Sequence, residues 1–360
     1  MNHTQQQTII TDRIQKWLTI GDPTKPLILS HLYLTSLPLL PSTVEVLHID
    51  NNRLTVIDGT LLPPMLRILQ CNNNKLQYIT NLPSHLTHIE CSNNYLSALT
   101  DLPQSLKVLS CSSNNIRHID ALPPNLIHLD CSCNILHILP HMNTQLQTLN
   151  CSINRISSLP PDLPESLKEL RCSSNMLTTL TNLPNHLGIL ICSRNRLNSL
   201  EENLPSTLTT INCSSNRGIH TLPETLPDSL ETLLCDSCTL SHLPRTLPRN
   251  LMFLSCNNNN ITYIPSTLPS QLTTLHCNHN IISGSLYIPY HIKSLLCSHN
   301  KIQSVYGIHD NLHFLNVYNN PLLFSKRFDS EFTYHQYMNE VIGTCRTINT
   351  AIYDELCCYV

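Results

Sequence analysis

The cysteines of this chain recur at a regular spacing, and regularly spaced thiols suggest three kinds of chemistry. The sequence has 17 cysteines among 360 residues. Cysteines that folding brings together form disulfides, bind soft metal ions such as zinc, or sense oxidants as thiolates. Twelve of them follow one another at intervals of 20 to 22 residues, namely Cys71, Cys91, Cys111, Cys131, Cys151, Cys172, Cys192, Cys213, Cys235, Cys256, Cys277 and Cys297.

An apolar filling role explains this column of cysteines better than any of the three chemistries. Parallel side chains do not readily reach the disulfide dihedral angle of about 90°. A metal site and a redox sensor both need thiols that are accessible, whereas the column is expected to lie in a dry core. Leu29, Ile49 and Val317 occupy the same position in other copies, so the position accepts apolar side chains of moderate size. Cys133 lies outside the column and is the best candidate for a reactive thiol.

Histidines and catalytic motifs give no stronger indication of chemistry. His276, His279 and His299 are spaced to converge on one strand face, but Leu296 and Asn316 interrupt any pattern of ligands. The sequence has no Gly-rich phosphate loop, no nucleophile elbow and no His-Glu-x-x-His motif. We therefore expect no enzyme activity, with no catalytic, cofactor-binding or metal-binding residue.

The cysteine position belongs to a unit that repeats fifteen times between Leu29 and Val317. The copy at Leu86–Ser105 reads L-x-x-I-x-C-x-x-N-x-L-x-x-L-x-x-L-P-x-x. Its alternation around Cys91 predicts a short strand with one buried face, and its Leu-Pro pair predicts an extended, polyproline-like return. Because one copy cannot bury its apolar edge alone, the copies should stack into a solenoid with a parallel β-sheet on its concave face. An asparagine follows three residues after the cysteine position in all copies except those with Leu32 and Cys238, and we expect its amide to bond the backbone.

This unit resembles the leucine-rich repeat, with cysteine where leucine or valine is usual. The short period and the Leu-Pro pairs, such as Leu102-Pro103, resemble the bacterial-effector subclass, and the abundance of Cys and Asn is similar to that of repeat proteins of giant DNA viruses. The resemblance implies a leucine-rich repeat solenoid that binds a protein. Effectors of this kind can carry a ubiquitin-ligase domain with a C-x-D motif. Here Cys345-Arg346-Thr347 does not match that motif, so ligase activity is not carried over.

The two ends depart from the repeat and are expected to close it. We divide the chain into an N-terminal tail and helical cap (1–26), the leucine-rich repeat array (27–323) and a C-terminal helical cap (324–360). After a polar tail, Thr11–Ile20 has helical spacing of Ile14, Trp17 and Leu18, and we expect Trp17 to cover the first strand. At the other end, Phe328–Val341 and Thr344–Leu356 have helical character.

Composition limits the partners and the location. The formal net charge is −3 and the charged residues make up 12% of the chain, which gives no basic footprint for nucleic acid. No apolar run reaches the length of a membrane span, and Asp12, Arg13 and Lys16 interrupt any secretory signal. We expect a monomeric, intracellular protein located in the cytoplasm, with host cytoplasm included as a location.

One part of the predicted strand face is less polar than the rest. Outward positions over four adjacent copies carry large apolar residues, and exposed apolar patches mark interaction sites. We predict a partner-binding site made of this patch and a charged pair at its rim: Glu169, Arg171, Ile189, Ile191, Leu234, Met252 and Phe253. The sequence therefore predicts a non-enzymatic protein-interaction scaffold. The alternatives are a substrate-recognition subunit or effector acting with a ubiquitin-ligase complex, and a thiol or metal reservoir.

Overall fold

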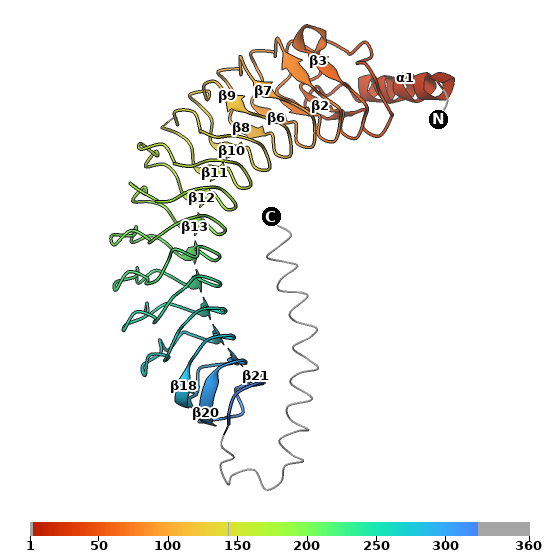
Figure 1. Cartoon of the computed structure of the whole chain (residues 1–360). Coiled ribbons are helices and arrows are strands. Elements are labelled where there is room, and N and C mark those ends of the chain that lie inside the picture. Colours follow the sequence, from red (N-terminus) through yellow and green to blue (C-terminus); the bar gives the residue numbers. More distant parts are fainter. Residues whose placement is uncertain (1–2, 143, 323–360) are drawn as a thin grey trace. The chain divides into compact units, whose positions relative to one another are not determined.

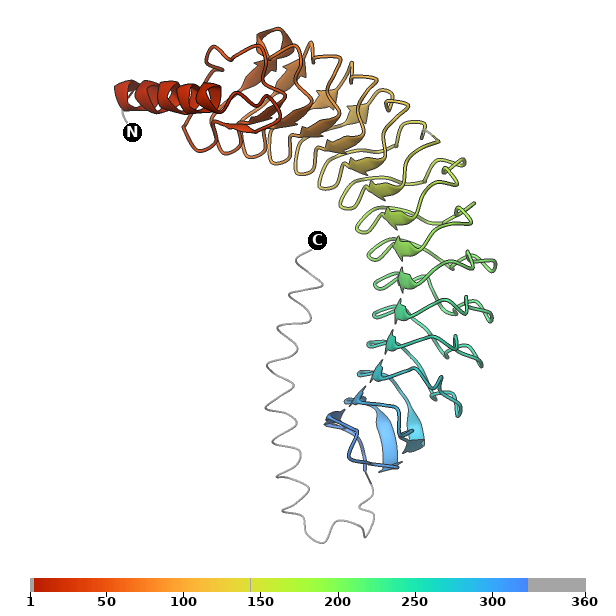
Figure 2. The ribbon, with the colours of Figure 1, turned by 180° about the vertical axis from the view of Figure 1, so that it is seen from behind.

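The computed structural model describes residues 3–142 and 144–322, which form two compact units. The first unit is Met1–Leu177 and the second begins at Thr178. Each unit is a stack of short turns of chain, as Figures 1 and 2 show. The helices predicted at Phe328–Val341 and Thr344–Leu356 lie outside the described residues.

The first unit contains eight parallel strands that pair in chain order, with one strand contributed by each copy of the repeat. Neighbouring strands pair in register, so that Leu69 lies opposite Ile89 and Ile89 opposite Leu109. The strands are β1 (Leu27–Ile28), β2 (Val46–His48), β4 (Ile68–Gln70), β6 (His88–Glu90), β8 (Val108–Ser110), β10 (His128–Asp130), β11 (Thr148–Asn150) and β12 (Glu169–Arg171).

The second unit contains seven strands paired in the same way. They are β13 (Ile189–Ile191), β14 (Thr210–Asn212), β15 (Thr232–Leu234), β16 (Phe253–Ser255), β17 (Thr274–His276), β19 (Ser294–Leu296) and β21 (Phe314–Asn316). In both units every predicted cysteine position, from Leu29 to Val317, falls directly after one of these strands. The predicted solenoid with a parallel sheet is therefore confirmed.

The return segments are mostly extended, and prolines set their turns. Leu86 donates its backbone N–H to the carbonyl oxygen of Pro83 at 3.2 Å, and Leu106 bonds Pro103 in the same way at 3.0 Å. Each Leu-Pro pair thus leads into a tight turn that returns the chain to the next strand. A few returns also pair as short parallel strands: β3 (Val56–Asp58) with β5 (Tyr78–Thr80), β7 (Ala98–Leu99) with β9 (His118–Ile119), and β18 (Ser283–Tyr287) with β20 (Lys301–Tyr306). A 3-10 turn, η1 (Gly59–Leu61), follows β3.

The column of asparagines forms a hydrogen-bond ladder, as the sequence predicts. Asn94 donates its amide to the carbonyl oxygens of Cys71 and Cys91 at 3.1 and 3.0 Å. Its side-chain oxygen accepts the backbone N–H of Leu76 at 3.0 Å. Each such amide joins two successive copies and pairs backbone groups that the end of the strand leaves buried.

The residue before the asparagine position has a left-handed backbone in all fifteen copies. Its φ lies between 52° and 63°, and none of these residues is glycine. Asparagine, the non-glycine residue best suited to this conformation, is the most frequent choice, but Ser, His, Cys, Arg and Ile also occur. The tight turn after each strand thus depends on the hydrogen bonds of the ladder, since most residues other than glycine do not favour a left-handed backbone.

The N-terminal helix α1 (His3–Ile20) is longer than predicted and begins at His3 instead of Thr11. Trp17 is buried, and its indole N–H donates to the carbonyl oxygen of Lys25 at 2.8 Å. Arg13 donates to the carbonyl oxygens of Ile28 and Ser30, both at 3.1 Å, so the helix lies against β1. Leu18, one of the three apolar residues at helical spacing, is exposed, whereas Ile10 is buried. Over the described residues no helix is both long and apolar enough to cross a bilayer.

Candidate functional site

The exposed face of the strands in the second unit presents two outward side chains per strand. In the strands of this face the middle residue is buried and the two residues that flank it are half-buried, because successive side chains of a strand alternate between faces. The exception is Ser255 of β16, which is buried as well. Strand register then arranges the outward side chains in two rows. One row runs Ile189, Thr210, Thr232, Phe253 and Thr274, and the other runs Ile191, Asn212, Leu234, Ser255 and His276.

The predicted apolar patch is divided in two by a polar strand. Ile189 and Ile191 lie on β13, whereas Leu234 lies on β15 and Phe253 on β16. Between them lies β14, whose outward residues are Thr210 and Asn212. The patch therefore consists of an isoleucine pair and a separate cluster around Phe253.

The cluster around Phe253 extends further along the chain than the sequence indicates. The rings of Phe253 and His276 contact each other edge to face, with centroids 5.1 Å apart. His276 in turn lies opposite Leu296 on β19. We define the Phe253 cluster as Leu234, Met252, Phe253, His276 and Leu296. Sequence analysis missed His276 and Leu296 as parts of this site, although both occupy the outward position that Leu234 occupies.

Burial keeps the Phe253 cluster uncharged. Desolvation lowers the pKa of His276 to about 4, so its imidazole is neutral at physiological pH and acts as an aromatic surface. Met252, which directly precedes β16, is the most exposed apolar residue of the cluster, with 44% of its surface accessible. The arrangement is an apolar and aromatic patch that has no charged side chain of its own.

The predicted rim residues belong to the first unit and bind each other. Glu169 and Arg171 are the two outward residues of β12, and the Arg171 guanidinium donates to the Glu169 carboxylate. The Arg171 side chain is 33% exposed and that of Glu169 26%. Their charges are thus largely compensated within one strand.

The exposed strand face of the first unit has apolar residues that sequence analysis missed. Val46 and Ile68 lie opposite each other on β2 and β4, and Val108 lies on β8. His88 separates Ile68 from Val108 in the same row. The side chains of Val46, Ile68 and Val108 are half-buried and include no aromatic ring or methionine, so they form no patch comparable to the Phe253 cluster.

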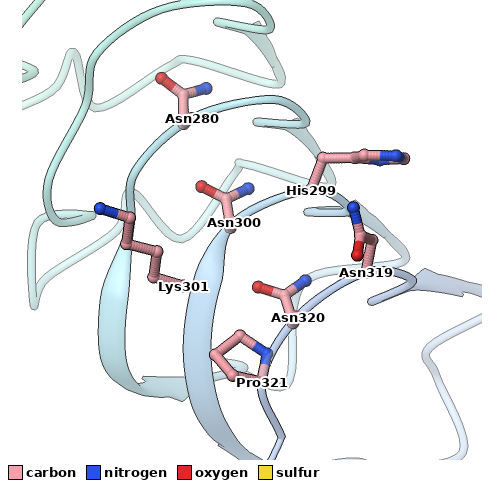
Figure 3. Close-up of a pocket in the computed structure, with 7 residues that line it drawn as sticks. All are labelled: Asn280, His299, Asn300, Lys301, Asn319, Asn320 and Pro321. Carbon is pink, nitrogen blue, oxygen red and sulfur yellow. The ribbon is translucent and has the colours of Figure 1, made fainter.

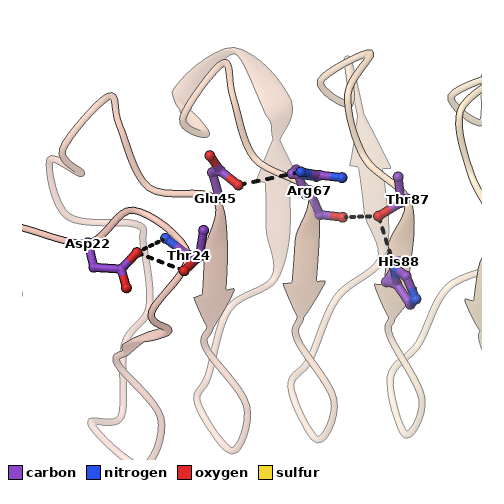
Figure 4. Close-up of polar contacts among 6 residues, drawn as sticks. All are labelled: Asp22, Thr24, Glu45, Arg67, Thr87 and His88. Atoms are coloured by element: carbon purple, nitrogen blue, oxygen red, sulfur yellow. Dashed lines mark hydrogen bonds and ion pairs between the residues drawn. The ribbon is translucent and has the colours of Figure 1, made fainter.

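Polar groups beside this face are already paired within the first unit (Figure 4). Glu45 and Arg67 form an ion pair at 3.8 Å, and the Thr87 hydroxyl donates to the Arg67 carbonyl oxygen at 3.1 Å. The same hydroxyl lies 2.8 Å from Nδ1 of His88. Burial, followed by the charge of Lys107, lowers the pKa of His88. These contacts hold Glu45, Arg67 and His88 in place beside the strand face.

Comparison with solved structures identifies the fold, whereas no family model and no curated protein matches the chain. YopM, a leucine-rich effector protein from Yersinia pestis, is 26% identical, with a TM-score of 0.73 over 88% of this chain and 93% of that chain. YopM from Yersinia enterocolitica is 27% identical, with a TM-score of 0.54 over 88% and 91%. A leucine-rich repeat protein of Leptospira interrogans is 21% identical, with a TM-score of 0.63 over 85% and 93%.

The chain has the leucine-rich repeat fold. Its similarity to YopM confirms the predicted resemblance to bacterial effectors. The predicted similarity to proteins of giant DNA viruses stays a prediction.

The cysteine column lies in the core of this leucine-rich repeat solenoid. All twelve cysteines of the column are fully buried and free. Burial raises the pKa of Cys91 and Cys151 to about 12, because the interior does not solvate a thiolate. The prediction that cysteine fills the core as a small apolar side chain is confirmed for its position, and buried thiols of high pKa are poor nucleophiles.

Cys235 of the column and Cys238 outside it form a pair whose spacing the sequence analysis overlooked. Cys235 and Cys238 have Cys-x-x-Cys spacing, and Cys238 replaces the ladder asparagine of its leucine-rich repeat. The Cys238 thiol donates to the carbonyl oxygen of Cys213 at 3.5 Å. A hydrogen bond with the Cys213 thiol lowers the pKa of Cys238. Both thiols are buried, so oxidants have little access to them.

The other candidates for chemistry do not converge on a site. Cys133 is half-buried in the left-handed turn position, with a φ of 53°. The rings of His279 and His299 stack with centroids 4.1 Å apart. Within residues 3–142 and 144–322, no three side chains of the types that bind metals come together in a way that could hold an ion.

An open hollow of about 470 Å³ lies beside the last described leucine-rich repeats (Figure 3). Asn280, Asn300 and Asn320 line it with amides that already belong to the ladder. His299 and Lys301 extend to opposite sides of these amides. The hollow therefore has no set of polar groups that point at a common ligand.

Proposed function

We propose that this leucine-rich repeat protein is a non-enzymatic scaffold that binds a protein partner on the exposed strand face of its second unit. The Phe253 cluster carries the proposal. It is an apolar and aromatic patch in rows whose other outward positions are mostly Thr, Asn and Ser.

The composition of the cluster fits a binding surface better than a purely structural one. Aromatic side chains contribute most to binding where they are rigid and centrally placed, and Phe253 is held by the His276 ring. Met252 is flexible and exposed, which suits contact with an irregular partner surface. The middle residues of β15, β16 and β17, Leu233, Leu254 and Leu275, already supply the buried core, so fold stability does not require apolar residues on the outward side.

The comparisons support a protein-binding role at a coarse level. YopM of Yersinia pestis, to which the chain is 26% identical, is described as a leucine-rich effector protein. We extend to this chain only the idea of a module that acts by contact with another protein. The free, buried cysteine column suits the intracellular, reducing setting that we include in the proposal, together with a monomeric chain.

Affinity capture with matched variants tests the proposal. Leu234→Asp with Phe253→Asp adds two carboxylates within the cluster, whereas Thr148→Asp with Thr210→Asp adds two carboxylates at outward strand positions that do not lie opposite any residue of the cluster. The amount of a partner that the unmodified chain captures from the native cell should fall about tenfold or more with the first variant and stay the same with the second. Both variants should keep the melting temperature, because all four side chains point out of the core. Equal capture by all three chains would reject the site.

A further inference from the structure

Charge is distributed unevenly around each turn of the solenoid. We define the ladder flank as the second to sixth residues after the cysteine position, a segment that contains the left-handed residue and the ladder asparagine. None of the fifteen copies has Asp or Glu in this segment. The cations that occur there are Arg53, Lys75, Arg117, Arg155, Arg194, Arg196, Arg217 and Lys301.

Most acidic residues of the described second unit lie on the return segments, namely Glu201, Glu202, Glu224, Asp228 and Asp310. The others are Glu231, directly before β15, and Asp236, directly after Cys235 and one residue before the ladder flank. Two arginines also lie on the return segments, and one of them, Arg249, pairs with Asp228 at 3.3 Å. The ladder flank of the second unit is therefore a basic edge on a chain whose net charge is −3.

Three arginines concentrate this charge on two adjacent copies, those of β13 and β14. Arg194, Arg196 and Arg217 are all exposed, and none has an ion-pair partner among the described residues. The two flanks are joined by the Leu197 N–H, which donates to the Asn216 side-chain oxygen at 3.0 Å. The cationic side chains thus project from a backbone that the ladder holds rigid.

Gly218 brings the two flanks unusually close together. A Cβ at this glycine would lie 2.6 Å from the carbonyl oxygen of Leu197 and 2.5 Å from the Asn198 side chain. Only glycine permits this approach. Because Arg217 directly precedes Gly218 and Arg196 directly precedes Leu197, the close approach brings the two arginine backbones together.

We propose that Arg194, Arg196 and Arg217 form a docking surface for an acidic, extended segment of a protein partner. Guanidinium groups bind carboxylates through two parallel hydrogen bonds, and their planar geometry reduces the conformational entropy lost for each hydrogen bond formed. Alternate side chains of an extended segment project at intervals of roughly 7 Å, a distance that flexible arginine side chains on neighbouring turns can match. This surface lies on the ladder flank and is separate from the Phe253 cluster, so it goes beyond the function proposed above.

The same residues fit a nucleic acid less well. The flanks of these two copies contain no Phe, Tyr or Trp on which a base could stack. Three cations beside acidic return segments also supply little of the phosphate neutralisation that sustains binding to nucleic acid.

Peptide binding to the full chain tests this inference. The probe is a fluorescein-labelled peptide of about 12 residues with alternating Glu and Ser, followed by anisotropy at about 50 mM and about 200 mM NaCl. The test variant is Arg194→Asn, Arg196→Asn and Arg217→Thr, which uses residues that other copies carry at the same positions. The control variant is Lys107→Thr, Lys168→Thr and Lys293→Thr, which removes the same charge from positions where Thr87, Thr209 and Thr273 occur in other copies.

The unmodified chain should bind the peptide at the lower salt concentration and more weakly at the higher one. Removal of the three arginines should weaken binding about tenfold, and the control less than about twofold. Phe253→Asp should leave peptide binding unchanged, which separates this surface from the proposed partner site. Absence of binding at low salt, or equal losses in both triple variants, would overturn the inference. Tighter binding of a uridine oligonucleotide of similar length, lost in the same arginine variant, would overturn it in favour of a nucleic acid.

Discussion

Ile219 donates its backbone N–H to the carbonyl oxygen of Asn216, three residues earlier in the same copy, at 3.1 Å. In other copies the equivalent N–H bonds the ladder asparagine of the next copy, as Leu197 does with Asn216. The difference arises because Gly218 is an additional residue between the asparagine position and the following apolar residue. The next copy therefore needs no side-chain acceptor at its asparagine position, and that position is occupied by Cys238.

This relationship predicts that the asparagines of the ladder contribute to stability, whereas an asparagine at the position of Cys238 would not. Asn94→Cys should lower the free energy of unfolding by about 2–3 kcal/mol, because it leaves the buried N–H of Leu76 without an acceptor. Cys238→Asn should change it by less than about 1 kcal/mol, because Ile219 already has a partner and the carbonyl oxygen of Cys235 already accepts from Asn259 at 2.9 Å. Urea denaturation followed by circular dichroism measures both variants. A large gain from Cys238→Asn would contradict this explanation of the interrupted ladder.

The sequence predicts most of the fold because each copy repeats the same local pattern. The cysteine positions mark every strand of the main sheets, and the asparagines mark every turn of the ladder, since both follow from alternation and spacing alone. The predicted start of α1 at Thr11 was wrong because the residues from His3 to Ile10 are mainly polar and show no helical spacing before Ile9 and Ile10.

The candidate site was harder to predict because it depends on which side chains touch. The spacing gives the two outward rows, but the division of the patch depends on the short polar side chains of Thr210 and Asn212 between Ile191 and Leu234. The contact of Phe253 with His276 joins residues on neighbouring strands that are not directly opposite, so it depends on side-chain orientation. Strand spacing does not specify that orientation.

The second prediction concerns stability at the left-handed turn position, which Ile153 occupies in one copy. This residue has a φ of 55° although its side chain is branched at Cβ, a conformation that such residues strongly disfavour. Ile153→Asn should raise the free energy of unfolding by about 1 kcal/mol, with some of the gain offset by the loss of half-buried apolar surface. Ile138→Asn is the matched control, because Ile138 is exposed and is not among the residues of positive φ. The prediction fails if the two variants have the same melting temperature.

Protonation of His276 should destabilise the second unit in mild acid. Its pKa is about 4 in the folded chain and about 6.5 in an unfolded one, because burial against Phe253 penalises the charged imidazole. Between these values the unfolded chain binds more protons, so stability should be full above about pH 6.5 and should fall as the pH drops towards 4. The loss from this one group is on the order of 2 kcal/mol.

Replacement by an uncharged residue isolates the contribution of this histidine. His276→Asn uses the residue that Asn150, Asn212 and Asn316 provide at the same position in other copies. The melting temperature of this variant should vary less between pH 7 and about pH 4.5 than that of the unmodified chain, because the titrating group has been removed. His242→Asn serves as the control, because His242 is only partly buried on a return segment and its ring already bonds the Ser241 hydroxyl at 2.8 Å. If the His242 variant reduces the acid sensitivity as much as the His276 variant does, the burial of His276 is not its cause.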